Sequence, residues 1–209
     1  MTTADQLVEA VGAAFAETGY GLAAWPDPHP DRAPLDAEYS RVTDPYKWRI
    51  VGARAEAWVA ALADAGLAEV APDAEVIWAA PPSTLMTRAT RITPHAAGAL
   101  PLVVARNRLA TVDDAGVTLG VGDPAFGLGM IPTCGCDACD SGSQDVLDEL
   151  DEYVLGVVSG AYRRLWRGDR DITVVSAKRW QASGRFGRGE VEAVLARPEG
   201  WHELVGNPW

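Results

Sequence analysis

The run SGSQDVLDELDEYVLGVVSGAYRRLWRG, residues 141–168, carries the strongest secondary-structure signal in the chain. Its apolar residues recur at intervals of three and four, which is the spacing of one face of an α-helix. Ser141 and Gln144 have the spacing of a capping box, and Gly168 is a natural terminator. Acidic first turns and the arginines at 163–167 would both complement the helix dipole. The sequence therefore predicts one long amphipathic helix, with an apolar face formed by Val146, Leu147, Leu150, Val154, Val157, Val158, Ala161, Tyr162 and Leu165.

Two further helices are predicted near the N-terminus. A capping box at Thr3 begins the first, and Gly19 ends it. Asp44 caps the second, Pro45 occupies its first turn, and the apolar spacing continues to Gly66. The predicted apolar faces are Leu7, Val8, Val11, Ala14 and Phe15 in the first helix, and Tyr46, Ile50, Ala53, Ala57, Trp58, Ala61 and Leu62 in the second.

After Pro72 the pattern changes to short segments rich in β-branched residues and separated by proline, glycine or aspartate. This predicts a mostly antiparallel sheet, with residues 113–116 (DDAG) as its best hairpin turn. The glycine-rich stretch 120–129 lacks the lysine of a phosphate-binding loop, so we interpret it as a turn-rich connector. The expected strands are EVIWA (75–79), LMTRATRIT (85–93), LPLVVARNRLATV (100–112), GVTLGVG (116–122) and a later one within 171–180, followed by a short helix at 189–198 and a tail.

Helices and a run of strands without regular alternation favour the α+β class over a doubly wound sheet. We predict a single α+β domain over residues 1–209, with a mainly antiparallel sheet and packed helices. Its expected parts are a helical N-terminal part (1–68), the sheet (69–131), a cysteine turn (132–142), and a long helix with the C-terminal part (143–209).

The net charge of −11 is concentrated in one quarter of the chain. No lysine or arginine lies between Arg108 and Arg163. Such a region repels phosphate backbones, so we expect no nucleic-acid binding there, and a basic protein partner or a second copy of the chain is possible. The basic segment 163–188 is expected to pair with it, within one chain or between subunits. The acidic residues of the interval are Asp113, Asp114, Asp123, Asp137, Asp140, Asp145, Asp148, Glu149, Asp151 and Glu152.

Several features together predict a soluble cytoplasmic protein. The opening MTTADQLVEA lacks the basic segment and the apolar run of a signal peptide. No apolar stretch reaches the roughly eighteen residues of a membrane span, so we expect no membrane association. An odd number of cysteines, gathered within six positions, argues against a disulfide framework. The excess of arginine over lysine is typical of a GC-rich bacterial genome.

All three cysteines lie in IPTCGCDACDSG, residues 131–142. Cys134, Cys136 and Cys139 have the spacing C-x-C-x-x-C, and short separations allow one turn to supply several thiolates to a tetrahedral Zn²⁺. Gly135 would let the backbone fold tightly between the first two. The sequence therefore predicts a zinc site with these three cysteines as ligands.

The neighbours of the cysteines bear on this prediction. Asp137 and Asp140 would raise the thiol pKa values in the absence of a cation, whereas a bound divalent ion would make their charge favourable. A structural zinc site is closed by four protein ligands, and a catalytic one keeps an open position. The fourth ligand is undecided among His29, His95, His202, Asp137, Asp140 and a water molecule.

Three functional hypotheses remain open at this level. The first is a structural zinc site in a protein of unknown biochemical role. The second is a zinc-dependent enzyme with an open metal position, and the third is a metal-free acidic interaction module. No G-x-S-x-G or H-E-x-x-H motif is present, so we assign no catalytic residue and no small-molecule ligand.

The run CGCDACD (134–140), followed by an acidic amphipathic helix, resembles a family of uncharacterised bacterial proteins known as a domain of unknown function. The resemblance covers most of the chain. It implies no activity, substrate or catalytic residue. It implies that the cysteine motif is a family feature rather than an accident of this sequence.

Overall fold

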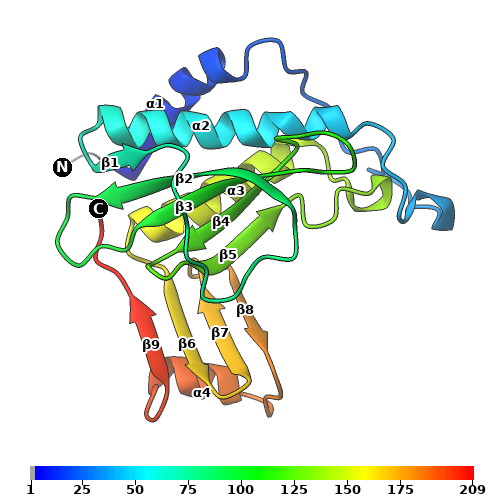
Figure 1. The fold of residues 1–209 in the computed structure, drawn as a ribbon. Coiled ribbons are helices and arrows are strands. Elements are labelled where there is room, and N and C mark those ends of the chain that lie inside the picture. Colours follow the sequence, from blue (N-terminus) through cyan, green and yellow to red (C-terminus); the bar gives the residue numbers. More distant parts are fainter. Residues whose placement is uncertain (1–2) are drawn as a thin grey trace.

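The computed structural model describes residues 3–209. Within them lie four α-helices and two antiparallel sheets, which confirms the α+β class (Figure 1). The first sheet has the order β1-β2-β3-β4-β5 and the second β8-β7-β6-β9. The strands are β1 (Ala68–Ala71), β2 (Met86–Pro94), β3 (Leu102–Asn107), β4 (Val117–Val121), β5 (Phe126–Ile131), β6 (Arg163–Arg167), β7 (Arg170–Val174), β8 (Trp180–Ser183) and β9 (His202–Val205).

The two N-terminal helices form as predicted. Helix α1 (Ala4–Thr18) begins with the capping box at Thr3, and α2 (Arg49–Asp64) follows a short 3₁₀ turn, Pro45–Trp48, capped by Asp44. The predictions that Val8 and Tyr46 belong to the apolar faces were wrong, because these residues are 37% and 63% exposed. Tyr46 lies in the 3₁₀ turn, where three residues per turn break the register of the following α-helix.

The main core lies between the first sheet and the helices. Strands β3 and β4 are buried along their whole length. Helices α2 and α3 (Ser143–Val158) pack against each other and against the sheet, and α1 packs on α2 (Figure 1). The β3–β4 hairpin forms around the predicted turn at 113–116. The largest wholly buried side chains of this core are Trp48, Trp58, Tyr162, Leu62, Ile92, Leu102, Leu119, Leu128, Ile131 and Leu150.

The predicted strand EVIWA (75–79) does not form. Its only ladder contact is an isolated bridge between Trp78 and Ala125. The Trp78 ring instead covers the sheet at Gly120, where an added Cβ would lie 2.6 Å from it. The apolar sequence of this segment therefore predicts a β-strand, but the segment packs over β4 without joining the sheet.

Strands β1 and β5 were not predicted, and the interpretation of 120–129 as a connector was wrong. Residue Val117 of β4 pairs with Ile131 of β5 in an antiparallel ladder whose register shifts between Leu119 and Gly120. The glycines of β5 had suggested turns. At Gly129 an added Cβ would lie 2.8 Å from the ring of Tyr153 on α3, so a glycine there permits close packing of helix on strand.

Helix α3 starts at Ser143, at the predicted end of the cysteine turn, but without the predicted cap. Its N-cap is Gly142, which has φ of +89° and provides no side-chain cap, so the predicted capping box at Ser141 was wrong. The Ser143 hydroxyl is instead engaged with the backbone of Trp25, at 3.0 Å. Contact with the N-terminal arm, residues 19–44, therefore replaces local capping.

Helix α3 also ends earlier than predicted. It stops at Val158, Gly160 has φ of +73°, and Arg163–Arg167 form strand β6. Gly168, with φ of +62°, is the turn between β6 and β7 rather than the end of a helix. The arginines thus do not cap the helix dipole. The apolar residues beyond Val158 kept helical spacing, but pairing of β6 with two neighbouring strands decides their structure.

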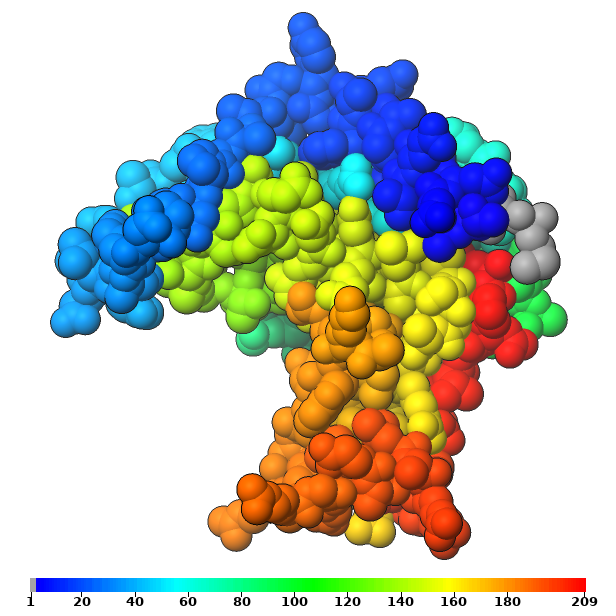
Figure 2. Space-filling model, turned by 180° about the vertical axis from the view of Figure 1, so that it is seen from behind, coloured from blue at the N-terminus to red at the C-terminus, as the bar shows by residue number. Residues whose placement is uncertain are grey.

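The C-terminal residues form a smaller lobe below the first sheet (Figures 1 and 2). This lobe has an apolar cluster of its own, separate from the main core, between the second sheet and α4 (Glu190–Ala196). The cluster consists of Leu165, Ile172, Val191 and Val194. The final helix was predicted, and the late strand predicted over 171–180 forms as β7 but ends at Val174. Strands β8 and β9 were not, because their residues are largely exposed and carry no apolar alternation.

Candidate metal centre

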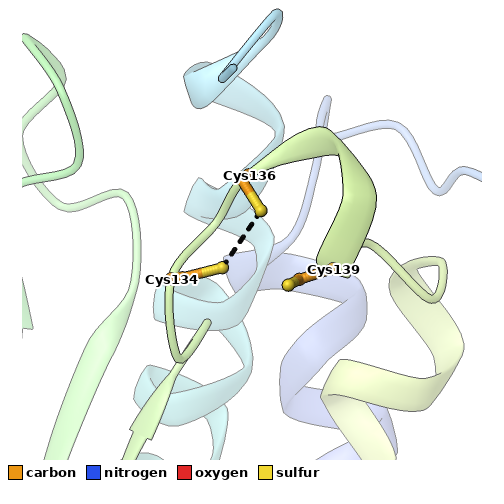
Figure 3. A group of neighbouring side chains, drawn as sticks. All are labelled: Cys134, Cys136 and Cys139. Carbon is orange, nitrogen blue, oxygen red and sulfur yellow. Dashed lines mark hydrogen bonds between the residues drawn. The ribbon is translucent and has the colours of Figure 1, made fainter. Parts of the chain in front are cut away.

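The three cysteines lie in the connection between β5 and α3. Their sulfur atoms all lie within 4.8 Å of one another and face a common space (Figure 3). The Cys134 thiol donates a hydrogen bond of 3.3 Å to Cys136 Sγ. Cys136 is buried, whereas Cys134 and Cys139 are exposed. This arrangement could hold a metal ion, with access from solvent.

The backbone of the turn depends on one glycine. Gly135 has φ of +69°, and an added Cβ would meet the Leu109 side chain at 2.6 Å. A short 3₁₀ turn, Asp137–Cys139, follows, and the Cys139 amide donates to the Cys136 carbonyl at 3.0 Å. Cys136 and Cys139 are thus held on the same side of one turn.

The thiols have different proton affinities. Burial raises the pKa of Cys136, but hydrogen bonds from the Cys134 and Cys139 thiols and from the Ser40 and Cys139 amides outweigh it and lower that pKa to about 7. The pKa of Cys139 rises to about 12, because its thiol donates to Cys134 and Cys136 and because negative charge on those two sulfurs disfavours a further thiolate. The cluster therefore favours one thiolate stabilised by neighbouring donors, which is the state from which metal binding begins.

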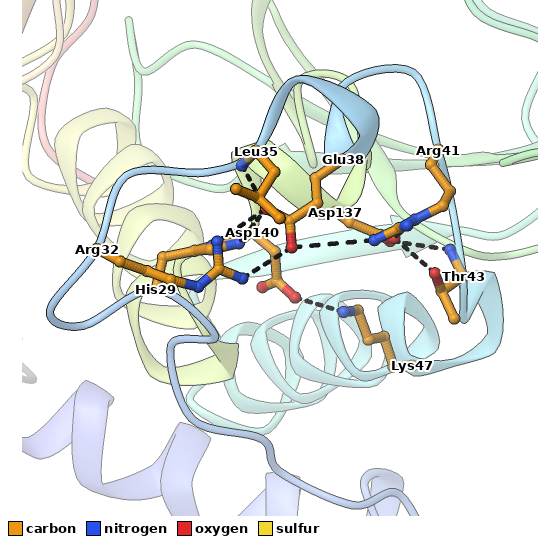
Figure 4. A network of polar contacts seen from close by, with 9 residues as sticks. All are labelled: His29, Arg32, Leu35, Glu38, Arg41, Thr43, Lys47, Asp137 and Asp140. Atoms are coloured by element: carbon orange, nitrogen blue, oxygen red, sulfur yellow. Dashed lines mark hydrogen bonds and ion pairs between the residues drawn. The ribbon is translucent and has the colours of Figure 1, made fainter.

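Asp137 lies outside the group of sulfurs and connects the turn to the N-terminal arm, residues 19–44. Its carboxylate accepts from Arg41 Nε at 2.6 Å and from the Thr43 amide at 2.9 Å (Figure 4). Its own amide donates to the Arg41 carbonyl at 2.7 Å. Burial acts to raise the pKa of Asp137, but the Thr43 and Arg41 donors outweigh it and lower the value to about 2.

Asp140 is similarly occupied. Its side chain is only 2% exposed and forms an ion pair with Lys47 (Figure 4). The other oxygen accepts from Trp25 Nε1 at 2.8 Å and from the Gly142 amide at 2.9 Å. The two aspartates beside the cysteines thus neutralise cationic side chains of the N-terminal segments, and their charge is not directed at the thiols.

The histidines also lie outside the thiol group. His29 Nε2 is 3.3 Å from Glu38 Oε2, and Arg32 pairs with the same carboxylate at 2.8 Å (Figure 4). His95 follows β2, and His202 on β9 stacks on Trp166 in the smaller lobe. Among residues 3–209, no histidine, aspartate or glutamate joins the three sulfurs within 4.8 Å. None of the proposed protein side chains is therefore placed as a fourth ligand.

A pocket of about 210 Å³ adjoins Cys134. Cys134 forms part of its wall, together with Thr84, Asn107, Arg108 and Thr133. A ligand in this pocket would lie beside Cys134, with hydroxyl, amide and guanidinium groups around it. Sequence spacing could not identify these residues, because they come from segments up to 50 positions apart.

The acidic quarter of the chain is largely paired within the molecule. Arg54 contacts Asp151 at 2.6 Å. Arg179 contacts Glu149 at 2.8 Å and Glu152 at 2.6 Å. The expected pairing with the basic C-terminal segment is therefore present at Arg179, and the other basic partners precede the acidic residues in the chain.

These features define an α+β protein with a cluster of three cysteines that could hold a metal ion. The chain belongs to a family of unknown function, DUF6226, whose family model matches residues 11–206. No curated protein and no solved structure matches the chain. None of the helices within residues 3–209 is long and apolar enough to cross a membrane.

Proposed function

We propose that Cys134, Cys136 and Cys139 bind one Zn²⁺ ion, and that this ion stabilises the connection between the first sheet and α3. The observation that carries the proposal is the approach of three sulfur atoms within 4.8 Å in a C-x-C-x-x-C turn. Zinc is the metal for which thiolate ligands at such short spacing are typical. The lowered pKa of Cys136 supports it, since a thiolate is the form that binds metal.

The structural role follows from where the turn lies. It joins the edge strand β5 to α3, and it contacts the N-terminal arm through Asp137 and Asp140. An ion that holds the three thiolates would fix the start of α3 against both β5 and the N-terminal arm. Because such a site does not exist in the unfolded chain, the binding free energy adds to the stability of the fold.

The test is metal analysis of protein purified without a histidine tag, combined with thermal unfolding before and after chelation. We expect about one zinc per chain, and at a free zinc concentration 100 times the Kd a stabilisation of about 2.7 kcal/mol. Cys136→Ser should lose the zinc, whereas Thr133→Ala, an exposed neighbour, should keep it. Metal-free protein with three freely titrating thiols, or an unchanged melting temperature after chelation, would refute the proposal.

A second candidate function is that of a zinc-dependent enzyme with an exchangeable water at the fourth position. Two observations favour it: no fourth protein side chain joins the group within residues 3–209, and Cys134 lines a pocket. In cobalt-substituted protein, azide should change the visible spectrum if the fourth position is open. An unchanged spectrum at saturating azide would refute the enzymatic role, and only the structural role would remain.

We further propose that the protein acts in the cytoplasm, where three free thiols remain reduced. The internal ion pairs of the acidic quarter reduce the charge available to a basic partner. This supports a metal site over the metal-free interaction module.

A further inference from the structure

A second pocket, away from the cysteines, is built around arginines. It has a volume of about 240 Å³ and lies between α2 and the first sheet. Arg49 of α2, Arg88 of β2 and Arg106 of β3 all line it. We call it the arginine pocket. Its other walls include Glu56 and Asp114.

Arg106 occupies a position where an apolar residue would be expected. It follows Leu102 and Val104 at intervals of two along β3, so its side chain leaves the strand on the same face as theirs. Both of those residues belong to the core, and Arg106 itself is only 6% exposed. Burying a guanidinium there costs desolvation free energy, so a compensating role is expected.

One nitrogen of Arg106 has no hydrogen-bond partner. Nη2 is 2.8 Å from Glu56 Oε1, but Nη1 is buried and makes no hydrogen bond among the described residues. A buried donor without an acceptor costs about 1–3 kcal/mol. An acceptor from a ligand would remove this cost.

Gly52 of α2 makes room for that nitrogen. An added Cβ at Gly52 would lie 2.3 Å from Arg106 Nη1. Gly52 and Arg106 both line the arginine pocket, so the unpartnered nitrogen belongs to a residue of its wall. A glycine in the middle of a helix costs roughly 0.5–1 kcal/mol relative to alanine, and here it leaves room for the buried guanidinium between α2 and β3.

The charges of the arginine pocket do not balance. Arg88 lies 3.3 Å from Glu56 and 3.2 Å from Asp114, and Arg106 shares Glu56. Arg49 donates from Nε to the backbone carbonyl of Asp113 at 3.2 Å instead of pairing with a pocket carboxylate. Three guanidinium groups thus face two carboxylates, which leaves one positive charge.

We propose that the arginine pocket binds a small monocarboxylate with an apolar body. A carboxylate carries the single negative charge that the pocket lacks, and its two oxygens suit the planar donors of a guanidinium. Tyr20 and Leu22 line the same pocket, and Tyr20 is 90% exposed. These side chains provide a surface for the apolar body of the ligand, while the volume restricts it to about the size of a benzoate.

Nuclear magnetic resonance titration of the full chain with benzoate tests the proposal, with benzamide as the uncharged isostere. We expect saturable shifts at Gly52 and at its neighbours in the pocket, and at least tenfold weaker binding of benzamide. Shifts that do not saturate, equal binding of benzamide, or tighter binding of inorganic phosphate would overturn it.

Four variants assign the binding to the pocket. Arg49→Gln, at an exposed residue that the core does not need, should weaken benzoate at least tenfold, as should Arg106→Lys. Glu56→Gln removes the competing carboxylate and should tighten binding severalfold. The matched control is Arg91→Gln, on the same strand as Arg88 but paired with Asp123 outside the pocket, and it should bind normally. Equal loss in Arg91→Gln, or unchanged binding in a folded Arg49→Gln, would refute the site.

Discussion

The indole Nε1 of Trp25 donates a hydrogen bond of 2.8 Å to Asp140, although 115 residues separate them in the chain. The same carboxylate forms an ion pair with Lys47, just before α2. The N-terminal arm, the start of α2 and the cysteine turn therefore meet at one buried carboxylate. The stability of the turn depends on this junction as well as on any metal it binds.

Replacement of this carboxylate should be costly. Asp140→Asn removes the partner of Lys47, whose side chain is only 21% exposed, so we expect a loss of about 2–3 kcal/mol in the free energy of unfolding. Urea denaturation measures it. Asp123→Asn is the matched control, because the Asp123 side chain is 53% exposed in its pair with Arg91, and the substitution should change stability by less than about 0.5 kcal/mol. Similar losses in both variants would show that the buried Asp140 carboxylate contributes no more to the free energy of unfolding than the exposed Asp123 carboxylate.

Gly135 should be required for the geometry of the thiols. Gly135→Ala places a Cβ at φ of +69° and 2.6 Å from Leu109, so we expect a loss of about 1–2 kcal/mol in stability and at least tenfold weaker zinc binding. Gly127→Ala on β5 is the control, since an added Cβ there meets nothing within 4 Å. Competition with a chromophoric chelator measures the zinc affinity. A Gly135→Ala protein that binds zinc normally would contradict the dependence.

Two helical glycines should respond in opposite directions to the same substitution. In α3, Gly156→Ala would bring a Cβ within 2.4 Å of the Val175 carbonyl oxygen and should cost about 1–3 kcal/mol. In α1, Gly12→Ala meets nothing within 4 Å and should stabilise the protein by about 0.5–1 kcal/mol. Thermal unfolding of both variants checks the sign. A stabilised Gly156→Ala would show that α3 and the segment after β7 are not tightly packed.

Tyr162 predicts a loss of stability at alkaline pH. Its side chain is 1% exposed and its hydroxyl has no hydrogen-bond partner, and burial raises its pKa from 10.0 to about 12. Because the folded state favours the neutral phenol, this contribution is complete below pH 10 and is lost as the pH rises toward 12. The slope is up to about 1.4 kcal/mol per pH unit.

Tyr162→Phe is the test of that slope. It removes an unsatisfied buried hydroxyl, so its stability at pH 7 should be unchanged or higher. Its free energy of unfolding should fall less steeply between pH 10 and 12 than that of the unaltered protein. Parallel pH profiles for the two proteins would contradict the assignment to Tyr162.

Elements with strong local signals were predictable. The capping box at Thr3 and the Asp44–Pro45 pair each determine a helix start through contacts within three residues. The hairpin at 113–116 likewise depends on a short turn between two apolar runs. The cluster of three sulfurs was predictable from their spacing together with Gly135, which lets this short segment fold back on itself.

Other elements were not predictable because distant contacts decide them. Residues Tyr162 and Leu165 continue the apolar spacing of α3, yet they are buried in two different cores. The glycines of β5 resemble turn residues until Tyr153 is seen to pack on one of them. In both cases pairing with other strands supplies more free energy than the local helical or turn preference.

The sequence by itself determined the α+β class, the two N-terminal helices and the three-thiol turn, because short-range spacing fixes each of them. Tertiary structure decided where α3 gives way to β6, and it assigned Asp137 and Asp140 to Arg41 and Lys47 instead of to a metal. It also placed Arg106 beneath Gly52, in a pocket that no motif marks. Charges and packing surfaces choose partners by proximity in space, and only the folded chain sets that proximity.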